Sequence, residues 1–296
     1  MPQGRHPLAE VFGHIPTDFS SKAVRFRKHR LCPFNNKVPS CTKDKAKDPL
    51  GVCSVRGKDG PVITCPIRFR EDWLIADDAA SFFFPEDASW TSLTEVRLAD
   101  QDGKSAGNID LVLVAYDRHG KVYDFGSLEI QAVYISGNVR DPFAHYMADC
   151  RENAEMDWAH EPNYPRPDFL SSSRKRLAPQ LMFKGGILHE WKKKMAIALD
   201  RPFFETLPEL QTVDRDVAEV AWLVYDLVFD EDESRYRLQN TKVIYTLFLD
   251  ALNRITRAKV GRVDDFLRIL QEKVDEKLET PPITNVLETP FTHSST

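Results

Sequence analysis

The chain lacks several features that would place it outside the ordinary globular proteins. It has no apolar run near the roughly 18 residues that a membrane-spanning helix needs. Its first residues lack the apolar stretch of a secretory signal, so we expect a soluble, cytoplasmic protein. Internal repeats and long low-complexity segments are also missing. Because 42% of the 296 residues are hydrophobic and 29% are charged, the composition indicates a globular protein with a substantial core.

The whole chain has no strong excess of one charge, but two of its parts do. The net charge is only −5 at pH 7. The stretch from Lys22 to Arg70 holds 13 lysines and arginines against three acids, so it carries +10 and the remainder carries −15. Such an asymmetry is typical of a phosphate-facing segment on an otherwise acidic protein. A solvated basic loop region is the alternative interpretation.

The cysteines form no CxxC pair, which excludes the common zinc fingers and ribbons. Four of the five cysteines nevertheless fall within 34 residues, in a segment that is poor in periodic apolar residues. Such a segment needs a metal ion or another support to fold, and a site of four thiolates is one solution. Zinc is the default ion, iron stays open, and free buried thiols are the alternative. The four are Cys32, Cys41, Cys53 and Cys65, whereas Cys150 stands apart and is expected in the core.

The clearest predicted element is a β-hairpin in the middle of the chain. Residues 107–116 alternate between apolar and polar side chains, residues 117–121 form a turn, and residues 122–135 form a second strand. Gly126 is expected at a bulge in that strand.

Helices and further strands surround this hairpin in the predicted order. The patterns indicate a helix or loop at 71–83, a strand or helix end at 92–98, helices at 142–155 and 174–199, strands at 218–229 and 235–239, and helices at 243–256 and 263–278. This order predicts an α/β fold with a mixed central sheet flanked by helices. We expect three parts: a loose N-terminal arm (1–21), a cysteine-bearing DNA-contacting module (22–70) and the α/β domain (71–296).

Two acids lie inside the otherwise apolar strands of the hairpin. Asp110 follows Ile109, and Glu129 shares one strand face with Gln131. An unpaired charge in such a strand is costly, which favours a functional role. Paired carboxylates on adjacent strands are suited to Mg²⁺, which can activate water for phosphodiester hydrolysis. Surface acids on a half-exposed hairpin are the alternative.

The pattern of Asp, then Glu-x-Gln, resembles the Asp…Glu-x-Lys hairpin of the PD-(D/E)XK nuclease superfamily. Five stretches are similar to one branch of it, the NotI-type (NotI/EagI-like) restriction endonucleases, in which Gln also replaces the superfamily's Lys. They are CPFNN at 32–36, DPLGVCS at 48–54, CPIRF at 65–69, GNIDLVLV at 107–114 and EIQAVYISGN at 129–138.

This resemblance implies a role for each residue of the hairpin. Asp110 and Glu129 are expected as catalytic Mg²⁺ ligands, with a backbone carbonyl of Ile130 as a further ligand. Gln131 is expected in the lysine position, where it can orient water but cannot supply a positive charge. Glu95 is a further catalytic candidate, because an upstream glutamate often completes such sites, although it is equally well an exposed acid.

The resemblance also implies how the protein acts. It predicts a type II restriction endonuclease that cuts a GC-rich palindrome containing GGCC, works as a homodimer and is paired with a cognate DNA methyltransferase. It further implies a single structural iron in the four-cysteine site. Arginine pairs well with guanine edges, so the expected DNA contacts are Arg25, Arg27, Arg56 and Arg68.

Two other functions stay open from the sequence. A metal-stabilised DNA-binding regulator would have no catalysis, and its Asp110 and Glu129 would be dispensable and far apart. A repair or recombination nuclease of the same superfamily would recognise the shape of DNA rather than its sequence.

Overall fold

The computed structural model describes residues 6–45, 47–258 and 260–279. By its internal contacts the chain divides into two units, residues 1–256 and residues 257–296. No helix in the described ranges is long and apolar enough to cross a membrane. The second unit contributes one described helix, α9 (Val263–Glu279), which confirms the helix predicted at 263–278.

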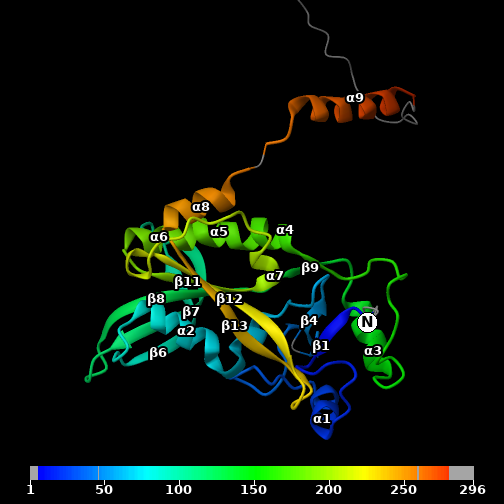
Figure 1. The fold of residues 1–296 in the computed structure, drawn as a ribbon, viewed down its shortest axis with the longest axis horizontal. Helices are drawn as coiled ribbons and strands as arrows, with labels where there is room; N and C mark the ends of the chain where they lie inside the picture. Colours follow the sequence, from blue (N-terminus) through cyan, green and yellow to red (C-terminus); the bar gives the residue numbers. More distant parts are fainter. Residues whose placement is uncertain (1–5, 46, 259, 280–296) are drawn as a thin grey trace, which may run out of the picture. The chain divides into compact units, whose positions relative to one another are not determined.

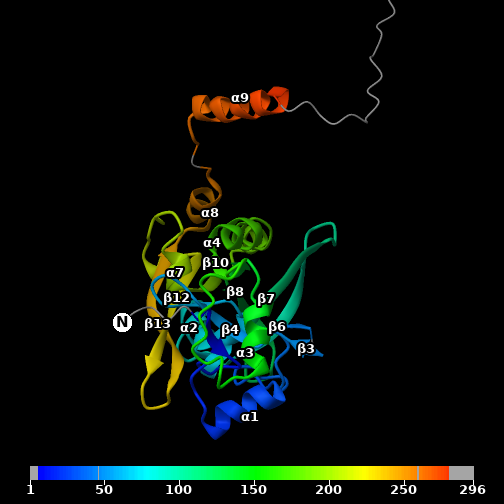
Figure 2. The same ribbon diagram turned by 90° about the vertical axis from the view of Figure 1, so that its right-hand side faces the viewer.

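A six-stranded mixed sheet forms the centre of the first unit, as the predicted α/β class requires. Its order is β13-β12-β11-β8-β7-β6, and β8, β11 and β12 run parallel while the outer pairs are antiparallel. The turns of β6–β7 and β12–β13 lie at opposite edges of this sheet (Figure 2). The strands are β6 (Trp90–Ala99), β7 (Ser105–Tyr116), β8 (Val122–Gln131), β11 (Met195–Asp200), β12 (Val220–Asp230) and β13 (Arg235–Thr246).

The two faces of the sheet pack against different helices. Alternate side chains such as Leu128 and Ile130 join the core formed with α2 (Leu74–Phe83). The opposite face carries Ile197 and Trp222 and packs against a helical run at 169–190 and against α8 (Phe248–Thr256). Figure 1 shows this run along one side of the sheet. It consists of α4 (Phe169–Ser172), the π segment η2 (Ser173–Leu177), α5 (Ala178–Gln180), the π segment η3 (Leu181–Gly185) and α6 (Gly186–Glu190).

The N-terminal arm belongs to a second, smaller sheet, which corrects the prediction that it is loose. Strand β1 (Leu8–Val11) pairs antiparallel with β4 (Val52–Arg56) of the cysteine segment, which pairs with β5 (Pro61–Ile63). Arg68 joins this sheet to the rest of the unit, because its guanidinium donates to Glu10 at 2.9 Å and to Glu71 at 2.7 Å. All three side chains are buried.

Short elements complete the first unit. They are α1 (Ser21–His29), β2 (Asp44–Lys45), β3 (Asp48–Pro49), the 3₁₀ segment η1 (Pro66–Trp73), β9 (Tyr134–Ser136), α3 (Arg140–Ala148), β10 (Arg166–Asp168), α7 (Arg201–Phe204) and the 3₁₀ segment η4 (Arg215–Val217).

Several predictions for the elements were wrong in part. The helix predicted at 174–199 ends at Glu190, and β11 follows as a fully buried strand. The strand predicted at 235–239 continues to Thr246, so the helix predicted at 243–256 begins only at Phe248. Gly126 pairs regularly with Leu113 instead of forming a bulge. A Cβ atom at Gly126 would lie 2.5 Å from the Phe83 ring, so this glycine lets α2 approach the sheet.

Candidate active site

Strands β7 and β8 separate where the two acids of the hairpin follow. Their register runs from Tyr116 to the pair Leu111–Leu128, and the next residues along the strands are Asp110 and Glu129. At this point the amide of Ile130 donates to Asp110 Oδ2 at 2.9 Å. A side chain therefore occupies the position that a backbone acceptor would take in a continuous ladder. The two strands diverge around the carboxylates.

Glu129 lies fully buried on the sheet face that the helical run at 169–190 covers. Its Oε2 atom accepts from Lys184 Nζ at 2.8 Å, and its Oε1 atom has no hydrogen-bond partner among the described residues. The pKa of Glu129 is raised to about 7, chiefly by burial and then by the charge of nearby Asp110, while Lys184 opposes both. The two carboxylates are therefore close enough to interact, contrary to what the regulator interpretation requires.

Gln131 is also fully buried, two residues further along the same face. Its Nε2 atom donates to Gln180 Oε1 on α5, whereas its Oε1 atom finds no partner within the described part of the chain. Ile130 places its side chain in the opposite core and its amide on Asp110. Two buried oxygens, one from Glu129 and one from Gln131, are thus left without donors, which suits a cation or an ordered water.

Glu95 occupies the strand next to Asp110. The register of β6 with β7 pairs Thr94 with Leu111 and Val96 with Ile109, so Glu95 comes opposite Asp110. Its backbone takes a left-handed φ of 55°, which is strained for a residue with a side chain, and the residue is exposed.

Three polar residues of the helical run reach this site, and no motif in the sequence points to them directly. Lys184 donates to Glu129 and to the carbonyl of Asn108, Gln180 accepts from Gln131, and the charge of Arg176 lowers the pKa of Glu129. They lie four residues apart, a spacing that is visible in the sequence. This four-residue spacing indicates a role in the site only when the run is known to pack on β8.

The donor set fits a Mg²⁺ ion held mainly by water and substrate. Among the described residues, no group of three or more His, Cys, Asp or Glu side chains is arranged to hold a metal ion. Mg²⁺ is commonly bound by one or two carboxylates together with waters and phosphate oxygens. The two carboxylates and the unpartnered oxygens of Glu129 and Gln131 meet that requirement.

The four clustered cysteines do not form a closed metal cage, as the same absence shows for the described residues. Their thiols are nevertheless near one another. The pKa of Cys32 is raised to about 12, chiefly by burial and to a smaller extent by Cys65 and Cys41. Burial likewise raises the pKa of Cys41 and of Cys53, with Cys65 contributing to both. Cys150 is half-buried and packs near the same cluster as β1 and β4.

The four arginines expected at DNA fall into two groups. Arg25 on α1 and Arg56 at the end of β4 are exposed. Arg27 is nearly buried and donates to the carbonyls of Asp18 and Ile15, and Arg68 is fully buried in its ion pairs. In this structure the guanidinium groups of Arg27 and Arg68 are occupied inside the protein.

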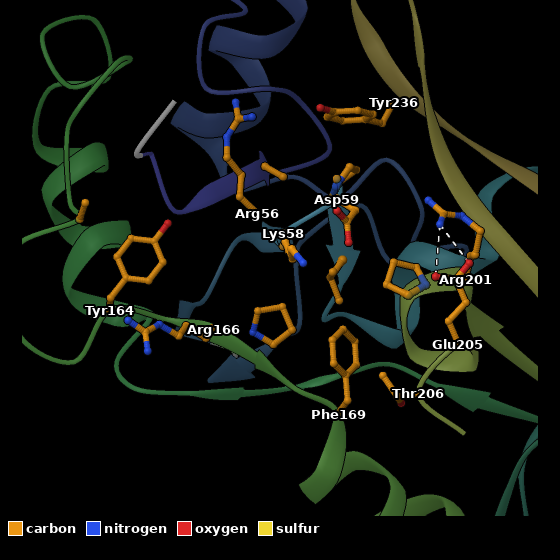
Figure 3. A pocket seen from close by; sticks show the side chains of 18 residues that line it. Arg56, Lys58, Asp59, Tyr164, Arg166, Phe169, Arg201, Glu205, Thr206 and Tyr236 are labelled. Atoms are coloured by element: carbon orange, nitrogen blue, oxygen red, sulfur yellow. Dashed lines mark hydrogen bonds and ion pairs between the residues drawn. The ribbon is translucent and has the colours of Figure 1, made fainter. Parts of the chain in front are cut away.

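A cavity of about 870 Å³ lies away from the hairpin acids. Figure 3 shows Arg56 and Arg166 on one side of it and Arg201, which pairs with Glu205, on the other. Asp110, Glu129 and Gln131 are not among the residues that line it, so it is a separate feature of the surface.

Comparison with known proteins identifies the family of this chain. The family model described as restriction endonuclease NotI matches residues 17–238. The match includes the hairpin, the helical run at 169–190 and all five cysteines. No curated protein matches the chain. Since the family model covers most of its length, the chain belongs to the NotI restriction endonuclease family, whose members are DNA-cleaving enzymes.

Proposed function

We propose that the protein is a type II restriction endonuclease that cuts both strands of a GC-rich palindrome containing GGCC. One observation supports this location of its active site. Asp110 and Glu129 lie where β7 and β8 separate, Gln131 shares the strand face of Glu129, and among the described residues one buried oxygen of Glu129 and one of Gln131 have no partner. The site of a phosphodiesterase needs such oxygens for a cation.

Asp110, Glu129 and the carbonyl of Ile130 would hold Mg²⁺ in this site. A bound Mg²⁺ ion lowers the pKa of water and offsets negative charge on the phosphate. The unpartnered Oε1 of Gln131 can accept a hydrogen bond from the attacking water and so orient it. In the reaction the water oxygen bonds to phosphorus and the bond to one sugar oxygen breaks. The proton that the water loses is balanced by the proton that the sugar oxygen gains.

Glu95 is proposed as an accessory acid of the same site. Its support is the register, which sets it opposite Asp110, together with a strained backbone that strands rarely retain without a reason. Because Glu95 is exposed, its carboxylate is available to water or to a second cation.

The basic segment at 22–70 is proposed to be a metal-stabilised DNA-contacting module. Mutual electrostatic effects among Cys32, Cys41, Cys53 and Cys65 support a common site, and a bound ion would draw the sulfur atoms together. The ion is iron by the resemblance or zinc by default chemistry. Metal analysis of the purified protein tests this: about one ion per chain is expected, and its loss in Cys53→Ser. A metal-free, folded protein with four titratable thiols would contradict it.

Contacts with DNA are proposed for Arg25 and Arg56, which are the exposed pair among the four expected arginines. Phosphate contacts release counterions, so binding should weaken as salt rises. The buried pair, Arg27 and Arg68, is better suited to holding the module together than to reading bases.

A homodimer is proposed because a palindrome cut on both strands calls for one active site per strand. The exposed apolar side chains of α9 offer a surface for the second copy: Phe266, Leu267 and Leu270 are 60%, 56% and 41% exposed. The helix has six acids against three bases, so DNA is an unsuitable partner for it.

A cognate DNA methyltransferase is proposed as the functional partner. It would protect the recognition sequence of the endonuclease in the DNA of the host cytoplasm.

Digestion of a plasmid with Mg²⁺ tests the proposed function. The native chain should give discrete fragments whose ends fall in one GC-rich palindrome, and Asp110→Ala should give none. Fragments whose ends follow DNA junctions or flaps would support the repair-type nuclease instead. No cleavage by the native chain despite tight DNA binding would contradict the proposal.

A further inference from the structure

The active-site face holds a buried cation that the strand motif does not supply. Lys184 lies on η3, only 6% exposed, with its Nζ 2.8 Å from Glu129 Oε2. The residue that follows Glu129 by two positions is the neutral Gln131. The positive charge beside the two carboxylates therefore comes from the helical run and not from β8.

The helical run at 169–190 turns a stripe of polar side chains toward the sheet. Arg176, Gln180 and Lys184 follow one another at intervals of four residues. Its α and π segments alternate, and the wider π turns bring the repeat to about four residues per turn, which keeps this spacing on one face. π segments inside helices are frequent at functional sites.

The burial of Lys184 is difficult to explain by stability alone. A buried ion pair is often no more stabilising than apolar residues of the same size. Its ammonium has three donors, and the bonds to Glu129 and to the Asn108 carbonyl use two of them. No acceptor among the described residues takes the third donor, and the ammonium lies beside Glu129, whose Oε1 atom is unpartnered.

We propose that Lys184 is a catalytic residue whose ammonium contacts a non-bridging oxygen of the phosphate that is cut. It supplies from the helix the positive charge that Gln131 cannot supply from the strand. The inference rests on the proposed active site at Asp110 and Glu129. Lys184 gains and loses no atom in the reaction, and its contribution is to stabilise the negative charge that develops on the phosphate oxygens.

The test compares Lys184→Gln with the native chain on a duplex that contains the site found by digestion. Single-turnover cleavage with Mg²⁺ should fall about 10²- to 10³-fold, the usual loss when one such donor is removed. The Kd for the duplex in EDTA should change by less than about threefold, and thermal unfolding should stay cooperative. Lys175→Gln is the matched control: it removes an exposed charge from the same run and should leave the rate unchanged.

A second variant tests two alternatives. In the first, Lys184 only balances the charge of Glu129, and in the second it is needed only for folding. Gln131→Lys is added to Lys184→Gln, which moves the ammonium to the strand. Recovery of the rate by at least about tenfold supports the proposal. A double variant that folds and binds the duplex but recovers no activity would overturn it, as would a Lys184→Gln rate within about threefold of native.

Asp110→Asn in the same assay separates this inference from the proposed function. If that variant cuts at the native rate, the proposed active site itself fails. If it is inactive while Lys184→Gln is fully active, the site stands and the role of Lys184 fails.

Discussion

Single charged residues are buried at two places in this protein. Glu129 is buried beside Lys184 at the proposed active site, and Arg68 is buried between Glu10 and Glu71. Arginine thus has two roles in this protein. An arginine on the surface is suited to DNA, whereas a buried arginine joins elements of the fold.

Replacing Arg68 should unfold the protein rather than alter its sequence preference. Arg68→Met leaves Glu10 and Glu71 buried without their partner, so the free energy of unfolding should fall by about 3–5 kcal/mol. Arg25→Met, at an exposed position, should change it by less than about 0.5 kcal/mol. Urea denaturation of both variants measures this difference. A stable Arg68→Met protein with altered DNA preference would contradict the buried role.

Asp200 should make stability depend on pH. Its carboxylate is buried and accepts from the amides of Ile63 and Phe203, and burial raises its pKa to about 7. The folded state therefore keeps its proton to a higher pH than the unfolded state, which releases it near 4. Stability from this group is present below pH 4 and is lost as the pH rises toward 7.

Asp200→Asn, which cannot ionise, should flatten that slope even if its overall stability is lower because one acceptor is lost. Thermal unfolding at pH 4.5, 6 and 7.5 shows the result. An equal slope in the native chain and in the variant would contradict the assignment.

The residues of the hairpin could be proposed from the sequence because strand alternation sets Glu129 and Gln131 on one face. Lys184 could not, because it is 55 residues from Glu129 in the chain and meets it only through packing of the run on β8. The burial of Arg27 and Arg68 was equally invisible, since it depends on partners in the arm and in β13.

Among the elements, strands with a periodic pattern of apolar residues could be predicted from the sequence, and strands without such a pattern could not. β7 and β8 alternate and were predicted closely, whereas β11 is buried on both faces and has no alternation to distinguish it from a helix. The end of β13 was missed because its last residues carry apolar side chains at a spacing that also suits a helix.

Gly126 provides a test of how α2 packs on the sheet. Gly126→Ala would place a Cβ atom 2.5 Å from the Phe83 ring, so it should cost about 1–3 kcal/mol of unfolding free energy. At Gly186 the same change meets nothing within 4 Å and lies in a helix, so it should stabilise by about 0.4–1 kcal/mol. Chemical denaturation of both variants checks the sign as well as the size. Equal effects would contradict the packing.

For the whole molecule, charge and apolar surface are divided between regions. The basic segment at 22–70 lies within the first unit, while the second unit contributes the acidic helix α9 with exposed apolar side chains. The sequence predicted the basic segment from its composition and a helix at 263–278 from its period. The proposed partners, DNA for the first and a second copy for the second, depend on surfaces that composition alone does not define.

Changing α9 should alter the state of association of the full chain. Leu267→Asp with Leu270→Asp places charge in the exposed apolar face, so sedimentation should show monomers where the native chain forms dimers. Gln271→Glu, a polar change on the same helix, should leave the dimer intact. A dimer that survives both leucine changes would exclude α9 as the interface.

Asp110 and Glu129 are proposed to form the catalytic centre. Single-turnover cleavage of the identified duplex by Asp110→Asn and Glu129→Gln tests this, with binding of the same duplex measured in EDTA. We expect both variants to bind DNA yet cleave at least about 10³-fold more slowly, while Asp102→Asn, in the exposed turn between β6 and β7, cleaves normally. Native cleavage rates in either active-site variant would contradict the account.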